Sequence, residues 1–172
     1  MLNLKYYQAL NRAIHDEMVA DESVVLLGED VGESGGIFGQ TKGLFDSFGS
    51  LRVRDTPIAE NGFVSTAIGA AMTGLRPVVE IGFEDFLTAC MDPLVNQAAK
   101  LRYMMGGQVN IPMVVYTIWR WRAERRSATQ PKLRAVVRPS SGAKGGNAVD
   151  TAGYILHDAC GDTGQQPSPR FA

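Results

Sequence analysis

Two glutamates occupy positions where a carboxylate could act on a bound ligand. Glu60 lies at the start of a segment, residues 61–73, that is otherwise uncharged and rich in glycine and alanine. If this segment is a helix, the positive end of its dipole favours an ionised carboxylate at Glu60. The glycine and alanine side chains that follow Glu60 have little bulk, so another backbone or a cofactor could approach this segment closely. The alternative is a glutamate that only caps the first turn, where acidic residues are common.

The second candidate carboxylate, Glu29, follows an apolar run at residues 24–27 that predicts a buried strand. In open α/β sheets, ligands gather at the carboxyl ends of the strands. The alternative for Glu29 is a solvated carboxylate at a strand end. Phe86 follows another predicted strand, residues 78–81, and could contact a ligand or simply pack in the core.

Helical and strand patterns alternate along the first two thirds of the chain. Helical patterns occur at residues 6–18, 43–48, 61–73 and 92–104. Strand patterns occur at residues 24–27, 78–81 and 111–115, with Arg76 and Pro77 expected to turn the chain before the second of these. This alternation predicts an α/β fold, a parallel sheet with helices on both faces. The apolar stripe of residues 92–104 could belong to the core or to a subunit interface.

Composition narrows the class of protein. The chain has 172 residues, which favours one domain with a possible tail. Its 17 basic and 18 acidic residues nearly balance, so no general field attracts nucleic acid or a membrane surface. Cys90 and Cys160 form no disulfide framework, and the first residues do not have the pattern of a secretory signal or transit peptide. A cytoplasmic protein with no nucleic-acid or membrane partner is expected.

Three stretches together carry a family resemblance. They are D-T-P-I-A-E-N-G-F from Asp55, G-L-R-P-V-V-E-I-G-F-E-D-F from Gly74, and D-P-L-V-N-Q-A-A-K-L-R-Y-M-M-G-G-Q from Asp92. The chain resembles the β subunit of the thiamine-diphosphate-dependent E1 component of 2-oxoacid dehydrogenase complexes, whose pyruvate, acetoin and branched-chain enzymes share this subunit. The resemblance implies a transketolase-like pyrimidine-binding domain at residues 1–115. It favours pyruvate or acetoin over a branched-chain substrate.

The resemblance also implies roles for individual residues. In this family, thiamine diphosphate lies between an α subunit, which holds Mg²⁺ and the diphosphate, and the β subunit, which binds the pyrimidine. Glu60 matches the catalytic glutamate that bonds a ring nitrogen and drives the tautomer change. Phe86 matches the aromatic residue that stacks on the ring, Ile58 and Gly82 match residues that line it, and Glu29 matches an acidic residue between the two sites. A second β subunit and a lipoyl acyltransferase are the further partners implied.

Beyond residue 115 the sequence changes character. Residues 116–172 are basic at first, have no apolar period, and place Trp119 and Trp121 beside arginines. One interpretation is a non-catalytic binding module whose basic tail binds acidic partners. The other is an out-of-frame tail, disordered or irregular, because a one-base shift converts both tryptophan codons to glycine and restores much of the family pattern R-T-P-x-G-G-G and Q-H-S-Q-S. The family's active-site histidine then falls at Thr129, so the chain is expected to be inactive as written.

Overall fold

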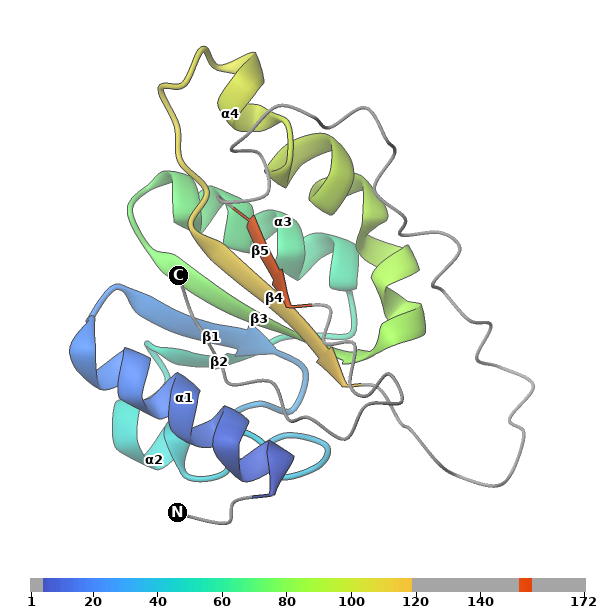
Figure 1. The fold of residues 1–172 in the computed structure, drawn as a ribbon. Coiled ribbons are helices and arrows are strands. Elements are labelled where there is room, and N and C mark those ends of the chain that lie inside the picture. The colour runs from blue at the N-terminus through green and yellow to red at the C-terminus, as the bar shows by residue number, and fades with distance from the viewer. Residues whose placement is uncertain (1–4, 119–151, 156–172) are drawn as a thin grey trace, which may run out of the picture.

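A parallel sheet forms the centre of the molecule (Figure 1). The computed structural model describes residues 5–118 and 152–155. The strands are β1 (Val24–Gly28), β2 (Val53–Asp55), β3 (Arg76–Phe83), β4 (Met113–Ile118) and β5 (Ala152–Ile155), in the spatial order β2-β1-β3-β4-β5. All four neighbouring pairs are parallel. The carboxyl ends of the strands therefore lie at one edge of the sheet.

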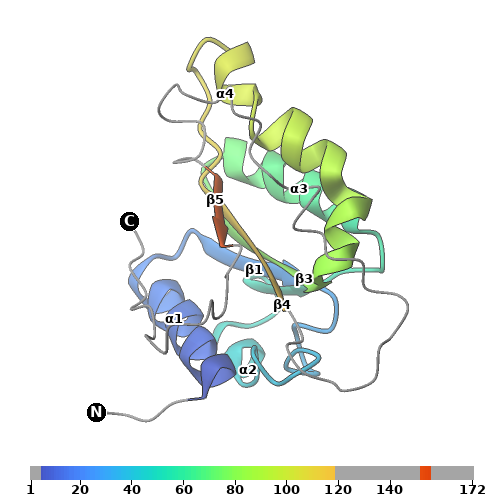
Figure 2. The ribbon, with the colours of Figure 1, turned by 45° about the vertical axis from the view of Figure 1, so that its right-hand side comes forward.

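Helices cover both faces of this sheet, as the turned view shows (Figure 2). One face carries α1 (Tyr6–Ala20) and α2 (Leu44–Phe48). The other carries α3 (Glu60–Met72), the 3-10 helix η1 (Glu84–Cys90), the π-helix η2 (Pro93–Ala98) and α4 (Leu101–Met104). The predicted fold class is therefore confirmed. In the part of the chain that the structure describes, no helix has the length and apolar character needed to cross a membrane.

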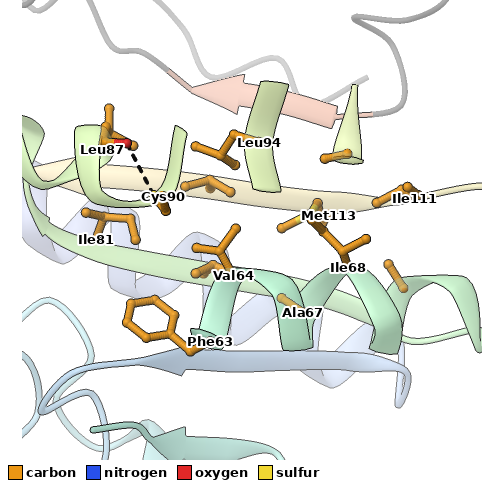
Figure 3. Packing of buried hydrophobic residues seen from close by; sticks show 14 residues of the cluster. Phe63, Val64, Ala67, Ile68, Ile81, Leu87, Cys90, Leu94, Ile111 and Met113 are labelled. Atoms are coloured by element: carbon orange, nitrogen blue, oxygen red, sulfur yellow. Dashed lines mark hydrogen bonds between the residues drawn. The ribbon is translucent and has the colours of Figure 1, made fainter. Parts of the chain in front are cut away.

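The larger core lies between α3, the later helical segments, and strands β3 and β4 (Figure 3). Val79 and Ile81 of β3 are both fully buried on this side. Ala67 and Ala71 of α3 are also buried, and their small side chains let the helix approach the sheet closely. Successive strand residues point to opposite faces, so Glu80 points to the side of α1 and α2.

The long helix expected at residues 92–104 is not regular, which corrects the prediction. Ala99 N–H donates to the Leu94 carbonyl, five residues back, at 3.1 Å, and Lys100 N–H donates to Gln97, three residues back, at 3.2 Å. The apolar stripe does not distinguish these bonding patterns, because side chains four residues apart lie on nearly the same face both in an α-helix and in the wider π-turn. Leu94 and Ala98 are buried in the core, whereas Val95 is 48% exposed. The interface interpretation of this stripe stays a prediction.

Arg76 and Pro77 do not turn the chain; they are the first residues of β3. The turn comes earlier, at Gly74, whose φ of 104° favours glycine. Arg76 N–H donates to the Ser23 carbonyl at 2.9 Å. Because alternate residues of a strand bond to opposite sides, the nitrogen of Pro77 faces away from β1, toward β4, whose pairing with β3 begins only at Val78. Proline is therefore tolerated at this place in the strand.

The sheet extends past residue 115, where the domain was expected to end. β4 continues through Tyr116 and Thr117 to Ile118, aromatic and β-branched residues that suit a strand beside the free edge of β3. Residues 152–155, expected to be irregular, form β5 and pair with β4, with Met113 opposite Ala152. The rest of the expected out-of-frame tail, including Thr129 and both tryptophans, lies outside the described residues.

Arg52 ties α1 to the sheet. Its guanidinium donates to the carbonyl oxygens of Met18, Asp21 and Val24, each at 2.8 Å from Nη2. Nε also donates to Val24 at 3.1 Å, and the Phe48 ring centre lies 5.0 Å from Cζ. The planar fork of arginine serves several acceptors at once, which a lysine ammonium cannot match in the same geometry.

We expect Arg52→Lys to lower the free energy of unfolding by about 2 kcal/mol, because charge-assisted hydrogen bonds to three carbonyls lose their geometry. Urea denaturation of the full chain measures this change. Arg54→Lys is the matched control, since Arg54 is exposed and its Nε bonds a single carbonyl, that of Leu51. Equal losses for both variants would contradict the role given to Arg52.

Candidate functional site at the carboxyl edge of the sheet

The carboxyl edge of the sheet gathers polar side-chain atoms that have no partner. Among the described residues, the buried side-chain oxygens without a hydrogen bond belong to Glu29, Thr56, Asp85 and Thr117. Glu29 and Thr56 directly follow β1 and β2, and Asp85 lies two residues after β3. Thr117 is the second-last residue of β4. Buried polar groups are nearly always paired, so four unpaired oxygens at one edge indicate a surface that a ligand or another chain completes.

Glu29 is not the solvated carboxylate of the alternative interpretation. Its Oε1 is buried without a partner. Burial raises the pKa of Glu29, and the nearby carboxylates of Glu60 and Asp30 raise it further. The structure thus brings Glu29 and Glu60 together, although one follows β1 and the other begins α3. In residues 5–118 and 152–155, no group of three or more His, Cys, Asp or Glu residues could hold a metal ion.

Glu60 is the first residue of α3 and the acidic residue of its first turn, as expected. The residue before it, Ala59, provides no side-chain cap for the helix. The Glu60 carboxylate also lies near the Cys90 thiol. Burial, together with this negative charge, raises the pKa of Cys90 to about 11. Glu60 is therefore placed at the helix end that favours a negative charge, beside Glu29 and above the apolar core.

The remaining predicted site residues lie along the same edge with different surroundings. Phe86 is 43% exposed, so it is not a core residue, and its ring meets Phe83 edge-on with centroids 5.8 Å apart. Gly82 leaves a gap that Ile37 occupies, since a Cβ at position 82 would lie 3.1 Å from Ile37 Cδ1. Ile58, between β2 and α3, is 84% exposed. No hydrogen bond or ring contact links Ile58 to the other predicted site residues within the described chain.

The sequence reasoning missed a buried polar cluster below this edge. Glu80 of β3 is 1% exposed and accepts hydrogen bonds from Gln40 Nε2 and from the Tyr116 hydroxyl. A signal for Glu80 was present, because a single carboxylate inside the apolar run at residues 78–81 must find buried partners. Gln40 and Tyr116 carried no such signal, since neither position follows a pattern.

This geometry suits a flat, partly apolar ligand with a basic nitrogen. Two neighbouring carboxylates on a desolvated edge can hold or accept a proton, and desolvation strengthens any bond to a ligand nitrogen. Exposed aromatic and aliphatic side chains beside them offer contact to a ring face.

The chain belongs to the family described as "Transketolase, pyrimidine binding domain", whose family model matches residues 3–118. The match ends at the last residue of β4 and includes every residue of the candidate site.

Individual relatives indicate a narrower class of protein than the domain family does. The chain is 45% identical over 123 residues to the acetoin:2,6-dichlorophenolindophenol oxidoreductase subunit beta of Bacillus subtilis (strain 168), covering 64% of this chain and 36% of the relative. It is 44% identical over 112 residues to the 2-oxoisovalerate dehydrogenase subunit beta of the same organism, covering 65% and 34%. It is 50% identical over 107 residues to the mitochondrial pyruvate dehydrogenase E1 component subunit beta-1 of Oryza sativa subsp. japonica, covering 62% and 29%. The match spans about a third of the length of these relatives, and the expected resemblance to E1 β subunits is confirmed.

The electrostatics of Glu29 predict a pH effect on stability. Since the folded state raises its pKa, the folded chain binds more protons than the unfolded chain from pH 4.5, the ordinary value, upward through the raised value. Stability contributed by protonated Glu29 is therefore lost as pH rises through this window. We expect Glu29→Gln to lose less stability than the wild type as the pH rises above 4.5.

Urea midpoints across this pH range measure the effect. Burial also raises the pKa of Glu80, so some slope remains in the variant. The control is Glu17→Gln, an exposed glutamate on α1. If the urea midpoint of Glu29→Gln falls with pH as steeply as that of the wild type, the raised pKa of Glu29 does not contribute to the pH dependence of stability.

Proposed function

We propose that this chain is the pyrimidine-binding part of the β subunit of a thiamine-diphosphate-dependent E1 component, from a dehydrogenase complex that acts on pyruvate or acetoin. The observation that carries the proposal is the Glu29–Glu60 pair at an edge with unpaired buried oxygens. Names of the relatives support the class of complex, since they are β subunits of acetoin, 2-oxoisovalerate and pyruvate enzymes. Oxidative decarboxylation with acyl transfer to lipoyl groups is the overall reaction proposed.

The residues present fit one end of this cofactor. A ring nitrogen and an exocyclic amine can satisfy carboxylates that lack partners, and a flat ring can lie against the exposed Phe86. Thiamine diphosphate, when bound, supplies the carbanion chemistry that decarboxylation of a 2-oxoacid needs.

Each site residue has a defined task in this proposal. Glu60 holds a proton at the ring nitrogen and so sets the tautomer of the ring. Phe86 contacts the ring face, and Gly82 and Ile58 border the ring. Glu29 can accept a proton beside Glu60, because the negative charge of Glu60 raises the pKa of Glu29.

Partners complete the site in the proposal. An E1 α subunit supplies the Mg²⁺ and diphosphate contacts, a second β subunit completes a heterotetramer, and a lipoyl acyltransferase accepts the acyl group. The unpaired oxygens of Asp85 and Thr117 face the same edge and suit burial against a neighbouring subunit. The exposure of Ile58 suits the same role.

We expect the full chain to bind thiamine weakly, since it offers one side of the site only. In ¹⁵N spectra, thiamine should shift the amides of Glu29, Glu60, Gly82 and Phe86 in a saturable way. Glu60→Gln should raise the dissociation constant roughly tenfold or more, because a charge-assisted hydrogen bond is worth about 1.5–3 kcal/mol.

Glu17→Gln is the control and should leave thiamine binding unchanged. Absence of saturable shifts at these four amides, or equal binding by Glu60→Gln, would overturn the proposed site.

We also propose that the chain passes out of frame near residue 116, close to the end of the family match at residue 118, and that it is inactive as written, because Thr129 stands where the family has a histidine. Sequencing the coding DNA of this strain and its close relatives should reveal a one- or two-base difference near codon 116. After mixing with an E1 α subunit, only a frame-corrected chain should decarboxylate pyruvate. Identical reading frames throughout would refute the proposed shift.

A further inference from the structure

A buried hydrogen-bonded chain connects the middle of β3 to the loop at residues 35–41. Glu80 Oε1 accepts from Gln40 Nε2, and Glu80 Oε2 accepts from the Tyr116 hydroxyl. Both Glu80 and Gln40 are 1% exposed, and Tyr116 is 4% exposed. A buried carboxylate costs free energy unless donors satisfy it, so the two donors are what allow Glu80 inside the sheet.

Gln40 uses both ends of its amide. Its Oε1 accepts the Phe38 N–H at 2.8 Å, while its Nε2 donates to Glu80. Because an N–H can only donate and a carboxylate accepts, these two neighbours determine which way the amide points. The backbone carbonyl of Gln40 is bound as well, by Asn11 Nδ2 at 2.9 Å.

The backbone of the loop is shaped around this amide. Gly36 has a φ of 82°, which favours glycine, and a Cβ at this position would lie 2.6 Å from both Cδ and Nε2 of Gln40. The side chain of Gln40 thus packs directly against the loop that it bonds.

The loop holds two large apolar side chains at the carboxyl edge. Ile37 Cδ1 lies over Gly82, as described above, and Phe38 meets Phe83 edge-on with ring centroids 6.1 Å apart. Ile37 is 44% exposed and Phe38 is 41% exposed. Phe83 also meets Phe86 edge-on, so partly exposed aromatic side chains follow one another along the carboxyl edge.

We propose that Gln40 and Glu80 are positioning residues that hold the loop at residues 35–41, so that Ile37 and Phe38 form a wall of the ligand site above Gly82 and Phe83. Neither positioning residue contacts the ligand; both act through the loop. The proposal deepens the proposed function and rests on it for the identity of the ligand, a pyrimidine.

The first test measures the loop itself by amide hydrogen exchange in the full chain. Gln40→Met keeps the side-chain length but removes donor and acceptor, so the Phe38 amide should exchange at least tenfold faster while amides of α3 do not change. Ser23→Ala is the matched control at the opposite edge: it removes the hydroxyl bond to Asp21 at 2.6 Å and should leave Phe38 protected. An unchanged Phe38 amide, or equal acceleration throughout the chain, overturns the proposal.

A second variant guards against unfolding, because Gln40→Met leaves Glu80 with one donor fewer. The triple variant Gln40→Met, Glu80→Met, Tyr116→Phe replaces all three members of the buried polar cluster by apolar groups of similar shape and leaves none of these donors unpaired, a change that is often neutral for stability. It should fold and still release the Phe38 amide. Glu80→Gln alone, which can still accept from Gln40 through its amide oxygen, should keep the Phe38 amide protected; if protection is lost while the chain stays folded, the bond from Gln40 to residue 80 is not what holds the loop.

The second readout is thiamine binding, measured by the same amide shifts. The triple variant should raise the dissociation constant at least threefold, with Ser23→Ala unchanged. A released loop with unaltered thiamine affinity overturns the role in the site. If the wild-type chain binds no thiamine, the proposed function fails, and with it the pyrimidine wall, whereas the exchange data alone still decide whether the pair holds the loop.

Discussion

Parallel pairing of β1 with both of its neighbours is the constraint on which the rest of the structure depends. Gly28 lies opposite Asp55 of β2, and Leu27 lies opposite Val79 of β3, so the three strands end at the same edge. Because each following segment starts there, Glu29, Thr56 and the end of β3 come together from distant parts of the sequence. Antiparallel pairing of any of these strands would send its polar end to the opposite edge, where Arg52 instead closes the sheet with carbonyl bonds.

The carboxyl edge combines negative charge with incomplete solvation. Glu29 and Glu80 both have pKa values raised first by burial, and each also feels a neighbouring carboxylate. Glu80 is compensated by its two hydrogen-bond donors, whereas Glu29 Oε1 has no partner in the described chain. The difference separates a supporting carboxylate below the edge from one that is available to a ligand. A cationic or proton-bearing group of a ligand would relieve the repulsion between Glu29 and the neighbouring carboxylates of Glu60 and Asp30.

Periodicity predicted most of the elements because each buries one continuous face. The first helix, the strand after it and the helix that begins at Glu60 were all placed within a few residues, and Glu29, Glu60, Gly82 and Phe86 fall along the expected edge. The failures have physical causes. Spacing of apolar residues cannot distinguish an α-turn from the wider turn that Ala99 closes on Leu94. The Gln40–Glu80 bond joins residues far apart in sequence, and β5 depends on the edge that β4 offers rather than on its own pattern.

The contact of Ile37 with Gly82 has an evolutionary consequence. Within the part of the chain that the structure describes, a Cβ at position 82 would crowd one atom, Ile37 Cδ1 at 3.1 Å, and shortening Ile37 to valine removes that atom. Alanine at position 82 would therefore require Ile37 Cδ1 to move by a few tenths of an ångström, whereas valine at position 37 leaves the space free. The two positions should therefore be coupled, with alanine at position 82 found more often beside valine than beside isoleucine at position 37.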